Sequence, residues 1–464
     1  MPHPEVSAGA SGFAGPGVRL PRLRATAVRQ ALLLGGGAAL GQGLAVLSAP
    51  LLTRLYDVGA FGVFGSFSAA ASCLACVATL RFDQAILLER DETAAADVLR
   101  LCVLSVGVVT LATALGAAVL GVLTSEALAG QRAASVPPGA LSGVVLVLLP
   151  CAVASGGVVP ALTLWFVRSE RYRPVATYGA SRSGLAVVLQ AVGGAVAGRG
   201  GGMGVVAGGL GAGLLVGGQV AGQGLAAIWL ARAGGPALRT ALLRGWSLER
   251  LRGAARRHRS FALYGAPQVL LRLLATSLPA MLLPAFYGAA QAGLFWLAYR
   301  MLVLPQQVLT ESLRPVFFRR AAALHAAGED TRRAALRLAA LLGALCLPVA
   351  AALMLAGPAL FALVFGPAWR GAGHDAALIA LPWCLETMQM PSAVLVAVLR
   401  RQRAYLGVEA ASLLGRAAAL CAGAAWGSPD LAVGLYAAVW AATNAGVIAW
   451  MTQPPASGQQ GLHA

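Results

Sequence analysis

The sequence predicts an all-α protein that crosses a membrane about twelve times. Of its 464 residues, 58% are apolar and only 11% are charged, and the mean hydropathy is +0.74. A soluble protein usually carries about 25% charged residues. Apolar stretches of about 20 residues, the length that a bilayer requires, recur along the whole chain. The arginines alternate between dense and sparse loops, which is typical of a polytopic membrane protein.

Twelve apolar stretches are long enough to span a bilayer. The predicted spans are 31–53, 60–80, 101–123, 140–166, 175–197, 203–231, 261–285, 289–312, 338–357, 374–398, 405–426 and 430–451. The first apolar run is too long for the core of a signal peptide, so we expect an uncleaved first helix.

The arginine distribution predicts the orientation. All 35 basic residues are arginine, and 27 of them fall in one set of alternating loops and the N-terminal tail. The opposite loops hold only Arg54, Arg132, Arg199 and Arg370. The positive-inside rule then places both termini in the cytoplasm of a bacterial inner-membrane protein. The net charge of +18 lies in short loops between spans, so no nucleic-acid-binding surface is predicted.

The two halves of the chain resemble each other. Tyr56 is followed six residues later by Gly62-Val63-Phe64, and Tyr287 is followed six residues later by Gly293-Leu294-Phe295. Each motif joins the first two helices of a six-helix unit, which indicates a parallel repeat. The predicted organisation is a basic tail, a six-helix bundle, a basic linker, a second six-helix bundle and a short tail, at 1–30, 31–231, 232–260, 261–451 and 452–464. Two such bundles would enclose the cavity of an alternating-access transporter.

Four arginines lie inside predicted spans: Arg182, Arg272, Arg300 and Arg416. Each costs roughly 2.5–3.5 kcal/mol near the bilayer centre, so such residues normally face a protein interior or a wet cavity. Arg182 is near enough to a helix end to reach the interface instead. For Arg272, Arg300 and Arg416, the alternative to a role in a cavity is an ion pair with Glu386 that joins two helices. Because the arginines outnumber the acid, the pattern predicts a cationic cavity for an anionic substrate.

Polar side chains inside the spans add to this predicted cavity, above all Gln306 and Gln389. Glu386 is the acidic residue nearest mid-span, and His374 begins the tenth span beside Asp375. Either Glu386 or His374 could couple transport to protons, although a role at the start of a helix explains His374 equally well.

The sequence lacks the patterns of an enzyme or a metalloprotein. Cys73 and Cys76 form a single CxxC pair on a membrane helix, where they read as packing residues. No phosphate-binding loop is present, so energy must come from a gradient or a partner. No cofactor, metal site or catalytic residue is predicted.

Several motifs resemble those of the Wzx-type polysaccharide flippases, which belong to the multidrug/oligosaccharidyl-lipid/polysaccharide exporter superfamily. They are Pro50 to Tyr56, Phe61 to Phe64, Thr79 to Leu88 with the acidic residues from Glu89 to Glu92, Gly293 to Phe295, Ala298-Tyr299-Arg300, Leu304-Pro305, Leu363 to Gly366 and Trp369. With the hydropathy pattern they cover most of 30–450. One departure is Val58-Gly59-Ala60, which stands where the family often has an acidic residue.

This resemblance implies the fold of the MATE transporters and a flippase that moves undecaprenyl-pyrophosphate-linked oligosaccharides for surface polysaccharide synthesis. Its partners would be the lipid-linked substrate, the bilayer, and polysaccharide polymerase and glycosyltransferases. Family members line their lumen with cationic residues, so Arg272, Arg300 and Arg416 are the expected substrate ligands.

Three alternatives remain open. A drug exporter of the same superfamily would favour an acidic lumen, whereas a lipid II flippase would share the cationic chemistry. A polysaccharide polymerase is disfavoured because no predicted periplasmic loop is large enough for the acceptor site of such an enzyme.

Overall fold

A computed structural model describes residues 22–129, 143–200, 206, 208–399 and 401–452. This part of the chain is almost entirely helical. Its elements are α1 (Arg22–Leu55), α2 (Val58–Ala78), η1 (Phe82–Leu87), α3 (Glu92–Ala129), α4 (Gly143–Arg168), α5 (Tyr172–Gly200), α6 (Gly208–Ala233), α7 (Gly235–Leu243), α8 (Leu248–Arg257), η3 (Phe261–Gly265), α9 (Ala266–Ala326), α10 (Thr331–Phe365), η4 (Pro367–Trp369), α11 (Arg370–Val398), α12 (Gln402–Ala425) and α13 (Pro429–Thr452). Some of the predictions concern residues outside these ranges, namely Arg132, residues 1–21 of the basic tail and residues 453–464.

The prediction of an all-helical polytopic membrane protein is confirmed. Within the described ranges, ten helical segments are long and apolar enough to cross a membrane. One of them, Phe261–Ala326, contains the two predicted spans 261–285 and 289–312, and α1 adds a shorter apolar segment, Ala39–Leu55. The two spans of α9 are joined at Gly288, whose backbone leaves the helical region at φ 84° and ψ 170°. This positive φ is one that glycine adopts without steric cost.

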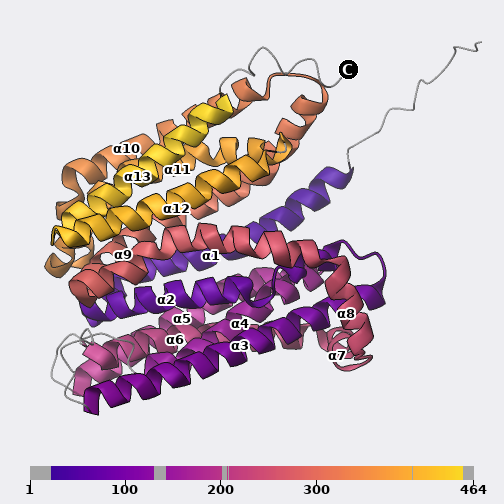
Figure 1. The fold of residues 1–464 in the computed structure, drawn as a ribbon, viewed down its shortest axis with the longest axis horizontal. Coiled ribbons are helices and arrows are strands. Elements are labelled where there is room, and N and C mark those ends of the chain that lie inside the picture. Colours follow the sequence, from indigo (N-terminus) through magenta and orange to yellow (C-terminus); the bar gives the residue numbers. More distant parts are fainter. Residues whose placement is uncertain (1–21, 130–142, 201–205, 207, 400, 453–464) are drawn as a thin grey trace, which may run out of the picture.

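The long helices run roughly parallel and form two groups on either side of α9 (Figure 1). Helices α10 to α13 lie on one side and α2 to α6 on the other, while α2 packs along α9. Helix α11 is the most enclosed, with 72% of its most apolar stretch buried, against 6% for α3. Helix α11 therefore lies inside the protein, and α3 presents its apolar surface outward, as a lipid-facing helix would.

Several predicted loops are shorter than expected because the helices continue past the apolar spans. The arginine-rich segment 313–337 is mostly helix, since α9 runs to Ala326 and α10 begins at Thr331. Arginine is a good helix former, so charge marks the edge of the bilayer without ending the helix. Likewise, α3 begins at Glu92, inside the predicted loop 81–100.

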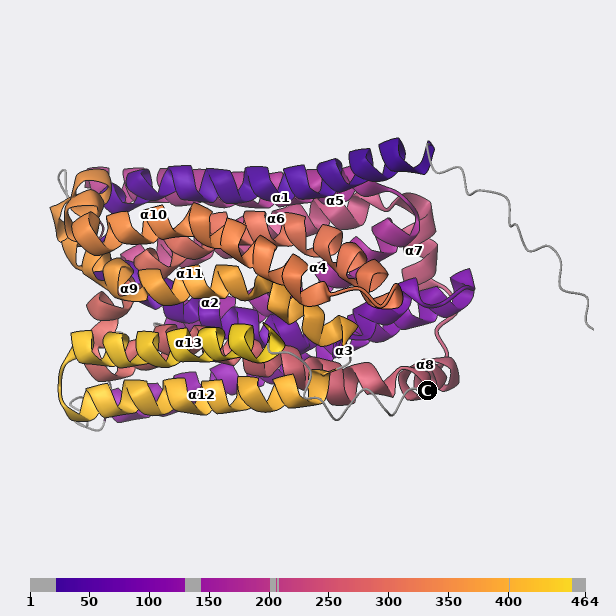
Figure 2. The ribbon, with the colours of Figure 1, turned by 90° about the horizontal axis from the view of Figure 1, so that it is seen from above.

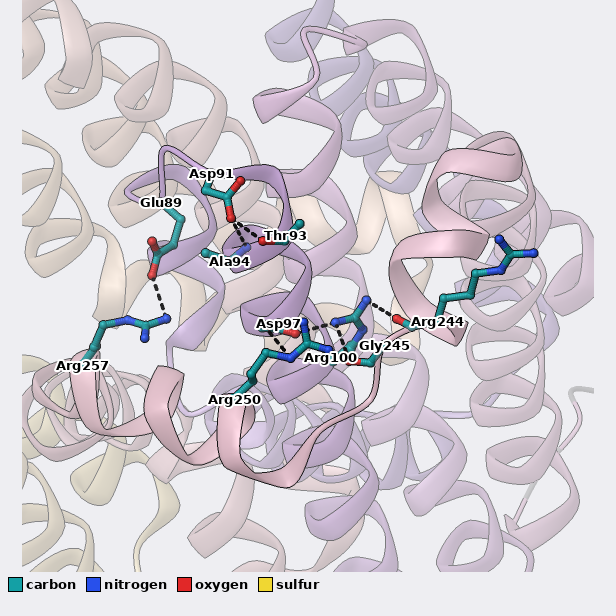
Figure 3. Close-up of polar contacts among 10 residues, drawn as sticks. All are labelled: Glu89, Asp91, Thr93, Ala94, Asp97, Arg100, Arg244, Gly245, Arg250 and Arg257. Atoms are coloured by element: carbon teal, nitrogen blue, oxygen red, sulfur yellow. Dashed lines mark hydrogen bonds and ion pairs between the residues drawn. The ribbon is translucent and has the colours of Figure 1, made fainter.

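The segment 232–260, predicted as a loop, contains the two short helices α7 and α8. Both lie at the same end of the molecule as the start of α1 (Figure 2). Arg100, near the start of α3, pairs with Asp97 and donates to the backbone carbonyls of Arg244 and Gly245, which follow α7 (Figure 3). Arg250 of α8 reaches the same carboxylate at 3.9 Å.

A second polar group holds the end of α8. The carboxylate of Glu89 lies 3.5 Å from the guanidinium of Arg257 and 2.8 Å from the ring nitrogen of His258. The segment that contains Glu89 is itself held by Arg168 of α4, which donates to the backbone carbonyls of Ile86 and Glu89. These contacts attach α7 and α8 to the first half of the chain.

At the opposite end of the molecule, the two copies of the repeated motif contact each other. A Cβ atom on Gly62 of α2 would lie 1.8 Å from the carbonyl oxygen of Ala289, and one on Gly293 would lie 2.0 Å from that of Val58. Ala289 is four residues before Gly293, and Val58 is four residues before Gly62. The two contacts are therefore related by the same offset of 231 residues that relates the motifs. The repeated glycine therefore lets α2 and α9 approach backbone to backbone.

Aromatic side chains surround this contact. Trp296 packs against Phe64 and Phe61, with ring centroids 5.0 and 5.9 Å apart, and Phe61 packs edge-on against Trp369 at 4.9 Å. The indole nitrogen of Trp369 donates to the carbonyl of Thr53 at 3.1 Å. These contacts join the first and second halves of the chain at this end.

Candidate functional site

A large cavity lies among α9, α11, α12 and α13, with α1 along one side. Its volume is about 1730 Å³, larger than the roughly 300–1,000 Å³ of a typical drug-sized pocket. Five arginines and three glutamates line it, so its lining carries a net positive charge: Arg272, Arg314, Arg319, Arg320, Arg416, Glu311, Glu386 and Glu409.

Arg416 of α12 is the most deeply placed of these cations. Only 5% of it is exposed, and its guanidinium lies over the rings of Tyr436 and Trp440 at 5.8 and 5.5 Å. Both rings come from α13, where they are four residues apart and therefore share one helix face. Cation–π contacts of this kind stabilise a desolvated guanidinium by about 2 kcal/mol, so α13 holds Arg416 in place without neutralising it.

Glu386 of α11 balances part of this charge. Its carboxylate interacts electrostatically with Arg416 and with Arg272, although no ion pair within 4 Å joins it to an arginine in the described chain. Gln389 lies three residues further along α11 and contacts the hydroxyl of Tyr405 at 3.5 Å. Gln306 faces the same cavity and is 8% exposed. The predicted residues Arg272, Arg416, Gln306, Gln389 and Glu386 therefore share one cavity.

Arg182 and Arg300 lie in a different, smaller cavity of about 50 Å³. It is formed by α1, α2, α5, α6 and the second span of α9, and Gln42 of α1 lines both cavities. The guanidinium of Arg300 lies 4.8 Å over the ring of Trp296, and its charge interacts with that of Arg182. The four intramembrane arginines are thus divided between two adjoining cavities, a division that the sequence did not indicate.

His374 lies away from both cavities. It is at the start of α11, where its ring nitrogen is 3.6 Å from the carboxylate of Asp430 and both side chains are at least half exposed. Its neighbour Asp375 is 1% exposed and is contacted by the amide of Gln291 at 3.3 Å. The coupling role of Glu386 or His374 stays a prediction. In the described chain, no three His, Cys, Asp or Glu side chains are grouped as metal ligands would be.

Some lining residues were not predicted as part of the site. Arg319 and Arg320 were counted as loop residues, and only the continuation of α9 brings them to the cavity. Trp296, which lines the small cavity, and Trp440, which lies against Arg416, read as ordinary apolar residues in sequence. Trp296 is four residues from Arg300, and Trp440 is four residues from Tyr436. Residues four apart share a helix face, so this spacing could have indicated that each pair lies together.

Comparison with known proteins agrees with this architecture. Residues 188–373 match the sequence profile of a family described as polysaccharide biosynthesis protein. No curated protein matches the sequence.

Solved transporter structures share the fold. A lipid II flippase, MurJ, in an inward closed conformation is 9% identical, with a TM-score of 0.67 over 90% of this chain and 87% of that chain. A multidrug resistance MATE family transporter of the MOP superfamily, in an inward-facing conformation, is 14% identical, with a TM-score of 0.64 over 89% and 96%. A MOP superfamily transporter from Pyrococcus furiosus is 14% identical, with a TM-score of 0.57 over 91% and 94%.

The fold is therefore that of the MATE and MurJ transporters of the MOP superfamily, a class of multi-pass membrane transporters. The part of the chain that matches the polysaccharide biosynthesis profile is 188–373, which is less than half of its length. This confirms the resemblance to the polysaccharide exporters that the sequence motifs indicated.

Proposed function

We propose that this protein flips undecaprenyl-pyrophosphate-linked oligosaccharide repeat units across the bacterial inner membrane for the synthesis of a surface polysaccharide. The carrying observation is the large cationic cavity, found in a chain that has a transporter fold and matches the polysaccharide biosynthesis profile over 188–373. An anionic pyrophosphate requires the positive charge of this cavity, and a bulky polar oligosaccharide requires its volume. The lipid tail would stay in the bilayer while the polar part crosses the protein.

The proposed cycle begins with the cavity open to the cytoplasm. Arg314, Arg319 and Arg320 line the part of the cavity nearest the end of α9, which the arginine distribution assigns to the cytoplasmic side. At the other end, the contact of Gly62 with Ala289 and of Gly293 with Val58 closes the passage. Separation of this contact, with closure at the cytoplasmic end, would expose the cavity to the periplasm.

A lipid II flippase is the second candidate, because MurJ, a lipid II flippase, has the same fold and a transporter of this kind would share the cationic chemistry. The family match to polysaccharide biosynthesis favours the first proposal. A drug exporter is less well supported, since a net positive cavity repels the cations that many drugs carry.

The test is a deletion of the gene in the native host, followed by mass spectrometry of undecaprenyl-linked oligosaccharides and assignment of the membrane face that they occupy. We expect complete single repeat units to accumulate on the cytoplasmic face. Single units on the periplasmic face would instead indicate a polymerase, accumulated lipid II would indicate the second candidate, and an unchanged lipid profile would contradict both flippase proposals.

A further inference from the structure

The segment 232–260, which joins the two halves, carries charge that the fold does not neutralise. It contains eight arginines and a single acidic residue, Glu249. Two of the arginines, Arg250 and Arg257, form ion pairs with acids of the first half. The other six have no ion-pair partner among the described residues. Most of the positive charge of this segment is therefore available to a partner outside the chain.

Helices α7 and α8 each bury one face against the protein and expose the other. On the exposed face of α8, Leu248, Arg252 and Arg256 are four residues apart and therefore share one side of the helix. The exposed face of α7 carries Arg239 and Leu243, which are also four residues apart. The buried residues of the two helices are Leu238, Ala241, Leu251 and Ala254. Each exposed face thus combines leucine with arginine.

Apolar side chains are exposed where the two helices join. Leu243 is 67% exposed, Trp246 is 49% exposed and Leu248 is 59% exposed. They lie on either side of the turn at Gly245, whose φ of 79° suits glycine. Tyr264, at the start of the following span, is 76% exposed. Leucine and tryptophan beside arginine are typical of a helical surface that lies in the headgroup region of a membrane.

Both short helices are tied closely to membrane-spanning helices. Helix α6 ends at Ala233, two residues before α7 begins at Gly235, and the next span begins at Phe261, four residues after α8 ends at Arg257. Both α7 and α8 pack against α3, the helix whose apolar surface faces outward. They therefore lie beside the lipid, at the end of the molecule that the arginine distribution assigns to the cytoplasm (Figure 2).

The paired and unpaired arginines point in different directions. Figure 3 shows Arg250 and Arg257 reaching toward Asp97 and Glu89, whereas the side chain of Arg244 points away from both acids. A guanidinium in such a position can bind phosphate oxygens through paired hydrogen bonds. Its charge is also attracted by the negative potential of the cytoplasmic leaflet, which contains anionic lipids. An acidic protein would match the charge equally well, but the position beside the outward-facing α3 favours lipid.

We propose that α7 and α8 form a surface that binds the anionic phospholipid headgroups of the cytoplasmic leaflet. Leu243, Trp246 and Leu248 enter the boundary between the headgroups and the acyl chains. Because both helices are attached to α3, this surface holds the cytoplasmic end of the first half against the leaflet. The inference does not depend on which substrate the protein transports. The arginines that contact the lipid phosphates are Arg239, Arg244, Arg252 and Arg256.

The test compares the purified full-length protein in nanodiscs of phosphatidylcholine alone and in nanodiscs with about 30% phosphatidylglycerol, an anionic lipid. Hydrogen–deuterium exchange is followed across residues 235–259. Each arginine near an anionic surface strengthens binding about fivefold, so we expect exchange to be at least about tenfold slower with phosphatidylglycerol. Salt at about 0.5 M should remove this difference because it screens the charges. Soluble glycerol phosphate, added to phosphatidylcholine nanodiscs, should not slow exchange, because it offers no bilayer to the apolar side chains.

The double variant Arg252→Gln/Arg256→Gln should lose most of the effect of phosphatidylglycerol. Glutamine is a good helix former, so α8 should remain folded, which exchange in phosphatidylcholine alone establishes. The matched control is Arg332→Gln/Arg337→Gln, which removes two exposed arginines from α10 in the second half and should retain the full effect. Trp246→Ser should speed exchange in both lipid compositions but keep the response to phosphatidylglycerol, because it removes only an apolar contact.

Equal exchange in the two lipid compositions, an equal loss in the α10 control, or slowing by soluble glycerol phosphate would overturn the lipid-binding surface. Exchange that is slow in native membrane particles but insensitive to phosphatidylglycerol in nanodiscs would also overturn it, and would indicate a protein partner instead. The proposed function fails separately, because the lipid-linked oligosaccharides of the deletion strain report on transport and not on the binding of phospholipid by α7 and α8.

Discussion

Placing an arginine inside a membrane costs free energy unless its surroundings stabilise the charge. In this chain Arg416 and Arg300 have different surroundings. Arg416 lies over two aromatic rings with Glu386 nearby. Arg300 lies over one ring and faces a second arginine. A purely structural arginine would normally be neutralised by a paired acid, so this incomplete neutralisation favours a role in binding an anion.

We expect Arg272→Ala, Arg300→Ala and Arg416→Ala each to reduce polysaccharide export at least tenfold without lowering the amount of protein in the membrane. A lost charge-assisted hydrogen bond is worth about 1.5–3 kcal/mol, which corresponds to this range. Export is measured as surface polysaccharide in a deletion strain that carries each variant. Arg370→Ala is the control, because Arg370 is an exposed residue at the start of α11. Normal export in all three single variants would contradict the assignment.

Among the elements, α2 and α9 make a close backbone contact at the end opposite α7 and α8, which we propose to be the closed end of the passage. Their backbones approach so closely at Gly62 and Gly293 that no side chain fits between them. The hydroxyl of Ser66 on α2 donates to the carbonyl of Ala280 on α9 at 2.8 Å. This contact brings together both copies of the motif, so each copy supplies one of the two surfaces that meet here.

We expect Gly62→Val to favour the state in which this end is open, because the new Cβ would lie 1.8 Å from the carbonyl oxygen of Ala289. Overpacking of this kind costs about 1–3 kcal/mol. The measurement is the labelling rate of a cysteine at position 444, within the large cavity, by a membrane-impermeant reagent applied from the periplasmic side of a variant that lacks the native cysteines. Gly43→Ala is the control, because its Cβ would meet no atom within 4 Å. Equal labelling of the two variants would show that this contact does not close the passage.

At the scale of the whole molecule, the connection between the halves belongs structurally to the first half. Helices α7 and α8 are attached to the start of α3 through Asp97, Arg100 and Arg250 (Figure 3). The helical turn that follows, η3, has π-type hydrogen bonding, which recurs at functional sites. If the two halves rock, α7 and α8 should move with the first half, and the bending should occur beyond them, near η3.

We expect Asp97→Asn to release α8 while leaving the membrane helices intact. Asp97 is buried and its partner Arg100 is 6% exposed, and removing one member of a buried pair costs about 3–5 kcal/mol. Hydrogen–deuterium exchange should therefore increase across residues 244–259. The matched control is Asp330→Asn, which affects an exposed carboxylate at the start of α10. Unchanged exchange in Asp97→Asn would indicate that other contacts hold α8.

The class of fold and the residues that could form a site follow from hydropathy and charge along the chain. Hydropathy located the spans, because each must satisfy its own backbone hydrogen bonds in lipid and therefore forms a helix. Charge identified Arg182, Arg272, Arg300, Arg416 and Glu386, because ionised groups are rare inside a membrane. The division into bundles at 31–231 and 261–451 and the cytoplasmic position of both termini stay predictions.

The grouping of these residues depends on how the helices pack in three dimensions. Arg182 and Arg300 are 118 positions apart in sequence but share one small cavity, while Arg272 and Arg416 share the large one. The contact of Gly62 with Ala289 and the position of α8 on α3 likewise join distant segments. Hydropathy and charge are properties of a segment and can be read along the chain, whereas the face that each helix presents, and to which neighbour, depends on packing between helices.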